Sequence, residues 1–152
     1  TLAVLDGMVV SVAGHSLIAP LTSLIESVQP RSADVRRLGP TACLLTFRGE
    51  HLPLIDLGVA LGYRQTAIDP ALGVILVVED DLGGRAALLV DEILGQRQVV
   101  IKSLEANYRA VPGVAAATIL GDGRVALILD VSAIVFAGRP SAAEPPLRLA
   151  TG

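Results

Sequence analysis

The segment VAAATILGDGRVALILDV, residues 114–131, is the feature that most restricts how this chain can fold. It holds two apolar runs separated by Asp122-Gly123, a pair that favours a tight β-hairpin turn. The second run, residues 125–129, has no polar residue, so a strand formed from it is apolar on both faces. Such a strand needs cover on both sides. The sequence therefore predicts that this hairpin is a wall shared by two packed layers.

The same pattern occurs earlier in the chain, which indicates an internal repeat. A shift of 74 residues aligns residues 47–61 with residues 121–135 and matches Asp56 to Asp130. A shift of 69 residues aligns the apolar positions of residues 18–26 with those of residues 87–95. We therefore expect two related β lobes that share a core. An aspartate in place of Ile128 is then expected to unfold both lobes together, because a buried unpaired carboxylate is costly.

Short apolar runs between turn residues recur along the chain and predict a mainly β fold. Three short helices are expected, over residues 21–25, 57–61 and 131–136, with Asp56 and Asp130 capping the last two.

Glycine-rich segments and a proline-rich end mark the connections. DDLGGR (residues 80–85) and LGDGR (residues 120–124) do not lead into long helices, so they are expected to be hairpin turns and not phosphate loops. The last segment, residues 137–152, holds three prolines and little periodicity. It is predicted to be a disordered tail or linker.

Composition argues against several kinds of partner. Hydrophobic residues make up 52% of the chain and aromatic residues 3%, so the core is aliphatic and few rings are present to stack on bases. The net charge is −3 and the basic residues are scattered, which argues against nucleic acid. The apolar runs are far shorter than the roughly 18 residues of a membrane helix, so no direct membrane insertion is expected. The start TLAVLDGM does not resemble a signal peptide, which favours the cytoplasm.

The titratable residues predict no catalytic or metal site. His15 and His51 are far apart and lack the spacing of a zinc motif, so both are expected on the surface. The single cysteine, Cys43, excludes an internal disulfide and is expected to be a buried thiol in a strand. The acidic groups at residues 79–81 and 91–92 would suit a small metal-dependent enzyme only if the fold brought them together. More often such acidic side chains lie at strand ends, where they are exposed to water.

Residues 88–135 resemble the CheW-like regulatory domain at the C-terminus of the chemotaxis histidine kinase CheA. The motifs LVDEILGQRQVVIK, LEANYR, VPG and ATILGDGRVALILDV carry this resemblance. FRGEHLPLIDL, residues 47–57, is similar to a hairpin of the same family, and TLAVLDGM, residues 1–8, resembles the junction with the ATP-binding domain. The resemblance thus extends over residues 1–136.

The resemblance implies a mainly β fold of two SH3-like five-stranded barrels packed on a shared hydrophobic core, with short helices. It divides the chain into a junction (residues 1–8), a regulatory domain of two lobes (residues 9–136) and the tail. It also implies a regulatory and scaffolding role in two-component signalling. Such domains bind the adaptor CheW and chemoreceptor tips, contact their own kinase domain through the junction, and couple receptor state to autophosphorylation at receptor arrays on the inner face of the membrane.

The same resemblance implies that this chain is not an enzyme and needs no cofactor, because the ATP site and the phosphoacceptor histidine of such a kinase belong to other domains. The full-length parent is then an ATP-dependent histidine autokinase. A stand-alone CheW-type adaptor is the alternative from the same fold, which TLAVLDGM and LEANYR disfavour.

By resemblance, partner contacts are expected around Arg48, which follows a strand of the first repeat. The expected neighbours are Gly49, Glu50, Leu52 and Leu57. Replacing Arg48 or Leu57 with alanine is then expected to weaken partner binding and to leave the melting temperature nearly unchanged. In the competing interpretation Arg48 only solvates a hairpin turn, as exposed arginines commonly do.

A receptor groove between the lobes is expected at the strand end formed by residues 89–94. Its predicted contacts are Val90, Asp91, Ile101 and Lys102. Apolar residues in such a strand are more often part of the core, so this assignment competes with a purely structural one.

Overall fold

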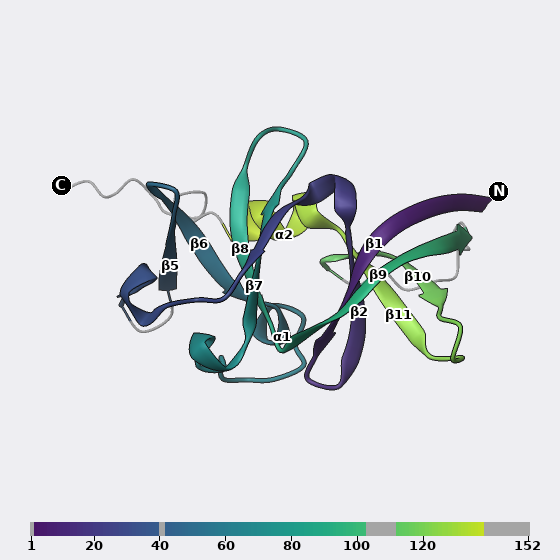
Figure 1. Cartoon of the computed structure of the whole chain (residues 1–152), viewed down its shortest axis with the longest axis horizontal. Helices are drawn as coiled ribbons and strands as arrows, with labels where there is room; N and C mark the ends of the chain where they lie inside the picture. The colour runs from purple at the N-terminus through teal and green to yellow at the C-terminus, as the bar shows by residue number, and fades with distance from the viewer. Residues whose placement is uncertain (1, 40–41, 103–111, 139–152) are drawn as a thin grey trace.

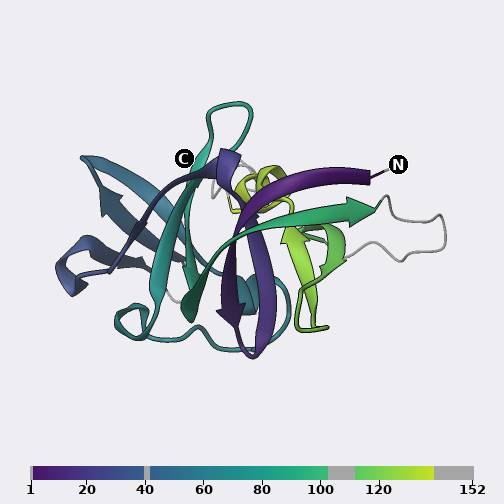
Figure 2. The same cartoon turned by 45° about the vertical axis from the view of Figure 1, so that its right-hand side comes forward.

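The structure is a computed structural model of the chain and describes residues 2–39, 42–102 and 112–138. Its strands form two sheets that pack against each other (Figures 1 and 2). We call them lobe 1 and lobe 2. Lobe 1 contains β3 (Leu24–Val28), β4 (Val35–Leu38), β5 (Ala42–Phe47), β6 (Glu50–Asp56), β7 (Val74–Glu79) and β8 (Arg85–Val90). Lobe 2 contains β1 (Leu2–Val12), β2 (His15–Pro20), β9 (Glu92–Lys102), β10 (Val114–Ile119) and β11 (Val125–Leu129).

The predicted mainly β fold of two lobes is confirmed, with one difference in strand number. In the part of the chain that the structure describes, the sheet of lobe 2 has five strands in the order β10-β11-β2-β1-β9, whereas that of lobe 1 has six in the order β3-β7-β8-β6-β5-β4. Within the described residues, β4 pairs with β5 and has no counterpart in the sheet of lobe 2. Arg36 and Arg37 are exposed on this edge strand, and charged side chains at such positions disfavour pairing with another sheet.

The internal repeat in the sequence corresponds to equivalent strand pairs in the two lobes. Each lobe contains a single parallel pair within its described strands, β6 with β8 in lobe 1 and β11 with β2 in lobe 2. Leu54 lies opposite Ala87 in the first pair, and Ile128 lies opposite Ile18 in the second. The two sequence shifts map these pairs onto one another, so the repeats have the same register.

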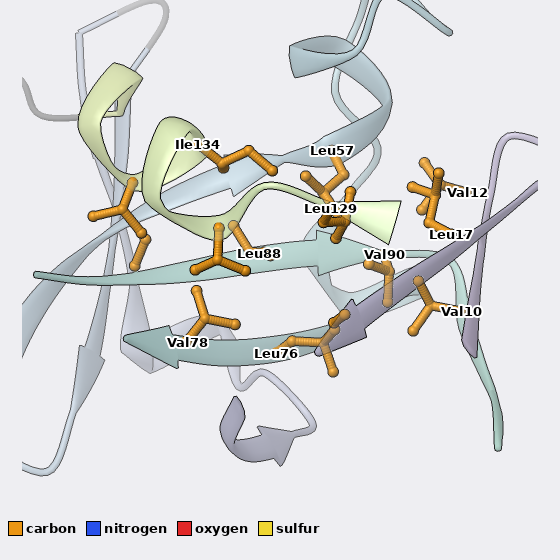
Figure 3. Close-up of a cluster of buried hydrophobic side chains, with 14 residues drawn as sticks. Val10, Val12, Leu17, Leu57, Leu76, Val78, Leu88, Val90, Leu129 and Ile134 are labelled. Atoms are coloured by element: carbon orange, nitrogen blue, oxygen red, sulfur yellow. The ribbon is translucent and has the colours of Figure 1, made fainter. Parts of the chain in front are cut away.

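The interior is arranged in three apolar layers, one inside each lobe and one between them. Alternate residues of β8 show how this arises: Leu88 faces the layer between the lobes, and Ala87 and Leu89 face the interior of lobe 1. We call the middle layer the shared core. Its buried residues come from β1, β2, β7, β8 and β11 and from the two α-helices (Figure 3).

Strand β11 does lie between two layers, as its two-sided apolar pattern predicts. Leu129 belongs to the shared core, whereas Ile128 belongs to the interior of lobe 2. Ile128 is therefore not a residue of the shared core itself. The turn end of the hairpin is not covered, because Ile119 and Val125 are 70% and 59% exposed.

Two of the three expected helices are present. The helices α1 (Leu57–Ala60) and α2 (Val131–Ala137) begin after Asp56 and Asp130, and each carboxylate accepts a hydrogen bond 3.1 Å long from a backbone N–H of its helix. Residues 21–25 are not one helix: the 3₁₀ turn η1 (Leu21–Ser23) leads directly into β3. Pairing of β3 with β7 outweighs the weak helical spacing of this segment.

Two further 3₁₀ turns, η2 (Ser32–Asp34) and η3 (Pro70–Leu72), precede β4 and β7. No helix of the described ranges is long and apolar enough to cross a membrane.

The expected boundary between residues 8 and 9 falls inside β1, which pairs with β2 and β9 on both sides of it. The segment around Gly7 is therefore a continuous strand and not a turn. Gly7 lies opposite Pro20 and Arg97, and a Cβ atom there would overlap the side chain of Ile18. At the other end, α2 extends to Ala137, and residues 139–152 of the expected tail lie outside the described residues.

Candidate partner-binding sites

The turn between β5 and β6 holds Arg48 in a backbone conformation that side chains rarely adopt. Arg48 and Gly49 have φ values of 51° and 82°, and the flanking residues Phe47 and Glu50 pair across the strands. These values correspond to a type I′ turn, in which a residue other than Gly, Asn or Asp is strained. The Arg48 side chain forms an ion pair with Glu26 of β3, and its guanidinium lies 4.7 Å from the centre of the Phe47 ring.

A second group of charges lies at the same end of lobe 1. Arg85, at the start of β8, is 2.9 Å from Glu50 and 3.8 Å from Glu79. We call the five side chains Glu26, Arg48, Glu50, Glu79 and Arg85 the lobe 1 tip. All of them are more than one-third exposed, so their ion pairs contribute little to folding stability. Their charges are available for contacts with another protein.

Three of the residues expected to touch a partner are buried. Leu52 lies in the interior of lobe 1, and Leu57 and Val90 lie in the shared core. Their side chains are 4%, 0% and 0% exposed, so none of them can form a docking surface in this fold. The expected neighbours of Arg48 that remain at the surface are Gly49 and Glu50.

Asp91 takes part in an ion-pair network that the sequence did not predict. Arg64 donates to Asp56 Oδ1 from Nε and Nη2, at 3.1 and 2.9 Å, and to Asp91 Oδ1 from Nη1 at 3.0 Å. Asp91 Oδ2 accepts the backbone N–H of Ala13, and Asp56 Oδ2 accepts that of Ile68. We call these contacts the Arg64 network.

Burial alone lowers the pKa of Arg64, but the hydrogen bonds and charges of Asp56 and Asp91 outweigh this effect and raise it. The guanidinium therefore stays protonated in a site where its side chain is only 16% exposed. Gly58 leaves room for it, since a Cβ atom there would collide with the Arg64 side chain. Next to Arg64, the ring of Tyr63 stacks on His15 of β2 with 3.7 Å between centroids and 10° between planes.

Apolar side chains from both lobes reach the surface where the lobes meet. Met8 of β1, Leu24 of β3 and Ile93 of β9 pack against the shared core and remain partly exposed. We call these three residues the seam patch. Ile93 lies within the strand end that the sequence singled out, whereas Leu24 was assigned to a helix. The other two expected groove residues lie farther along β9: Ile101 packs in lobe 2, and the Lys102 side chain is outside the described residues.

The remaining titratable candidates are separated by the fold. Glu79 and Val90 are at opposite ends of the β7 and β8 pairing, so the acidic groups at residues 79–81 and 91–92 do not share a site. His15 and His51 are both exposed, on different lobes, and Cys43 is half-buried in β5.

Comparison with known proteins accounts for this architecture. The family model described as "CheW-like domain" matches residues 6–137. The chain belongs to the CheW-like domain family. This match confirms the resemblance that the motifs of residues 88–135 indicated.

The curated relatives of this CheW-like domain are much longer proteins. The chain is 55% identical over 150 residues to the chemotaxis protein CheA of Rhizobium meliloti (strain 1021), which covers 99% of the chain and 20% of that protein. It is 50% identical over 134 residues to CheA of Salmonella typhimurium, covering 88% of the chain and 20% of that protein. The chain therefore spans about a fifth of these relatives. What they share with it is their CheW-like domain.

A solved structure supports the fold of this CheW-like domain. The scaffolding protein TtCheW from Thermoanaerobacter tengcongensis superposes with a TM-score of 0.68 at 18% identity, over 84% of this chain and 90% of that one. The two-lobed arrangement is therefore that of a CheW protein.

Proposed function

We propose that this CheW-like domain is the regulatory and scaffolding module of a CheA-type histidine autokinase, located at receptor arrays on the cytoplasmic side of the membrane. It binds a CheW-type adaptor and the helical tip of a chemoreceptor, and passes the receptor state to an ATP-dependent kinase domain elsewhere in the parent protein. The observation that carries this proposal is the 55% identity to CheA over nearly the whole chain. The module itself has no catalytic role and binds no cofactor.

The lobe 1 tip is the surface we assign to the adaptor. Arg48 is strained at φ 51°, and its side chain is 66% exposed yet fixed by Glu26 and Phe47. Strained residues of this kind are often found where the conformation serves binding. A fixed arginine also loses less conformational entropy when it binds than a free one does.

Replacing Arg48 with alanine is expected to weaken binding of the CheW-type adaptor by about tenfold, the low end for an arginine at an interface centre. The melting temperature is expected to change little, because the ion pair is exposed. Titration calorimetry against the adaptor from the same organism measures this. The control is Arg124→Ala, since Arg124 forms an exposed ion pair with Asp122 on the hairpin turn of lobe 2. Equal weakening by both variants would contradict the assignment to the lobe 1 tip.

The seam patch is the surface we assign to the receptor tip. It presents aliphatic side chains from both lobes at one boundary, and an amphipathic helix buries its apolar face on such a surface. A partner that contacts both lobes at once can also respond to, or alter, their relative position.

Replacing Leu24 with serine is expected to lower the affinity for a receptor-tip fragment by about tenfold, as for an apolar interface contact, and to leave adaptor binding unchanged. Fluorescence anisotropy with a labelled receptor-tip fragment measures the first and calorimetry the second. Leu72→Ser is the control, because Leu72 is 75% exposed on η3 and lies outside the seam patch. Unchanged receptor affinity in the Leu24 variant would remove the seam patch from the proposal.

Residues 1–8 are proposed to connect the domain to the preceding part of the parent protein. Because residues 2–8 form the first half of β1, a force on this connection acts directly on the sheet of lobe 2. The second candidate function is a stand-alone CheW-type adaptor, which the 90% coverage of TtCheW favours. A membrane reconstitution with receptor, adaptor and the full-length parent distinguishes them: a kinase module is needed in the same polypeptide as the kinase, whereas an adaptor acts as a separate chain.

A further inference from the structure

The two lobes are held together mainly by contacts that have no preferred direction. The shared core consists of aliphatic side chains, and apolar burial depends on area and not on the angle between surfaces. Between its described strands the chain also crosses from one lobe to the other twice, from β2 through η1 to β3 and from β8 to β9. Directional polar contacts therefore add to what the apolar layer and these crossings specify about the orientation of lobe 1 relative to lobe 2.

The Arg64 network adds directional contacts at the second crossing. Arg64 belongs to the segment between α1 and β7 of lobe 1, and Asp56 fixes it there with two hydrogen bonds. Asp91 lies between β8 and β9, and its two oxygens connect Arg64 to the backbone of Ala13, in the turn between β1 and β2 of lobe 2. A planar guanidinium that binds carboxylates in this way has strict geometric requirements.

A second contact between the lobes lies beside the first. Tyr63, next to Arg64 in lobe 1, stacks on His15, two residues after Ala13 in lobe 2. The turn that these contacts hold is itself strained, because Ala13 has a φ of 50°. The turn between β1 and β2 is thus held by two contacts: the hydrogen bond from Ala13 to Asp91, at the second crossing, and the stacking of His15 on Tyr63 of lobe 1.

The Arg64 network lies at the turn end of the paired strands β1 and β2, close to Ile93 of the seam patch, which lies opposite Val10, whereas Met8 of the seam patch lies toward the other end. Met8 lies opposite Ala19 near one end of this pairing, and Val12, just before Ala13, lies opposite His15 at the other. Four residues of an extended strand separate Met8 from Val12, which is about 13 Å. A rotation of lobe 2 about the shared core that displaces one end therefore displaces the other.

We propose that Arg64 is a positioning residue that sets the orientation of the two lobes and, through it, the spacing of the side chains in the seam patch. Leu24 belongs to lobe 1, and Met8 and Ile93 belong to lobe 2, so a change of orientation changes the surface that they form together. A buried ion pair adds little net stability compared with apolar residues of similar volume, and in some proteins such a pair fixes one arrangement instead. The consequence for receptor binding rests on the proposed function, whereas the effect on lobe orientation does not.

The orientation of the lobes can be measured by electron-electron double resonance between two spin labels. Suitable label sites are Ser27→Cys on β3 and Ala115→Cys on β10, both exposed, in a Cys43→Ser background. The test variant is Asp91→Asn, in which an NH2 group, a donor, replaces one of the two oxygens that separately accept from Arg64 and from Ala13. We expect a broader distance distribution and a mean that shifts by about 2 Å, the scale of element shifts at bistable interfaces. Arg64→Met is a second variant with the same expected direction.

The control variant Arg124→Ala removes an exposed ion pair within lobe 2 and is expected to keep the parent distribution. Circular dichroism establishes that each variant is folded. If Arg64→Met is unfolded, Asp91→Asn alone decides. The side chain of residue 91 is one-third exposed, and Arg64 keeps its ion pair with Asp56 in this variant, so no buried charge is left without a partner. Unchanged distributions in folded variants would overturn the proposal and leave the network a stabilising role only.

Receptor binding separates this inference from the proposed function. Asp91→Asn is expected to lower the affinity for the receptor-tip fragment about fivefold to tenfold, within the usual range of coupling between distant sites. Leu24→Ser is expected to lower it without changing the label distances. If the parent domain does not bind the fragment at all, the proposed function fails, while the distance measurement still decides whether the Arg64 network orients the lobes.

Discussion

A domain that carries Leu88→Asp is expected to be largely unfolded at 25 °C, with both lobes lost in one transition. Leu88 lies in the middle of β8 opposite Leu76, is fully buried, and belongs to the shared core (Figure 3). A carboxylate at this position has no cationic partner and costs several kcal/mol, comparable with the roughly 5–15 kcal/mol of a typical domain. Because strands of both sheets contribute to this layer, neither lobe keeps its apolar cover when the layer is disrupted.

Thermal unfolding followed by circular dichroism, together with a two-dimensional amide spectrum, tests this expectation. The matched control is Leu82→Asp, because Leu82 is 89% exposed in the turn between β7 and β8. This control is expected to melt as the parent does. A Leu88→Asp spectrum in which the amide signals of β9–β11 persist would show that lobe 2 folds without the shared core. Leu88 tests this layer more directly than Ile128, which faces the interior of lobe 2.

The layered arrangement could be predicted because it follows from patterns within short stretches of the sequence. A strand with apolar residues at consecutive positions, such as Val125–Leu129, needs cover on both faces, and the structure provides it from the two neighbouring layers. The capping aspartates Asp56 and Asp130 act within three residues of their own position. Both signals depend on short stretches of chain, which is why they can be found without knowledge of the fold.

The Arg64 network could not be predicted, because it depends on distant parts of the chain. Arg64 is separated from Asp91 by 27 residues and Asp91 from Ala13 by 78 residues. No spacing rule connects an arginine in a connecting segment with these partners. Leu24 was missed for a different reason: the apolar positions Leu21, Leu24 and Ile25 suit a short helix, but pairing of β3 with β7 decides the structure.

Part of the apolar hairpin remains unexplained by packing within the domain. Ile119 and Val125 are paired and exposed in lobe 2, whereas the corresponding pair of lobe 1, one pair farther from the turn than Phe47 and Glu50, is Thr46 and His51, whose side chains hydrogen-bond at 3.2 Å. The same hairpin position is thus polar in one repeat and apolar in the other. Within the described residues, the fold accounts for the buried half of β11 and not for this exposed pair.

The burial of Leu57 shows how a correct local prediction can lead to a wrong role. The sequence placed Leu57 directly after a capping aspartate at the start of a helix, which the structure confirms. The resemblance then suggested a surface contact beside Arg48. Because α1 packs between the lobes, its first residue points into the shared core instead, where Leu129 and Ile134 also lie (Figure 3).

Replacing Leu57 with alanine is therefore expected to destabilise the domain by about 2–5 kcal/mol, the cost of a cavity at a fully buried leucine. This corrects the expectation that Leu57→Ala leaves the melting temperature unchanged, and the effect on stability is expected to exceed any direct effect on partner binding. Urea unfolding at 25 °C measures it, with the slope of the transition showing whether the folded state remains compact.

The matched control for this variant lies two residues farther along the same helix. Val59 is 40% exposed, so Val59→Ala removes a side chain from α1 without leaving a cavity in the shared core. We expect it to change the free energy of unfolding by less than about 0.5 kcal/mol, as surface substitutions usually do. Equal stability of the two variants, with adaptor binding lost only in Leu57→Ala, would instead return Leu57 to the binding surface. Because its side chain is fully covered by residues of both lobes, we expect the opposite result: loss of stability, with adaptor affinity retained in the molecules that remain folded.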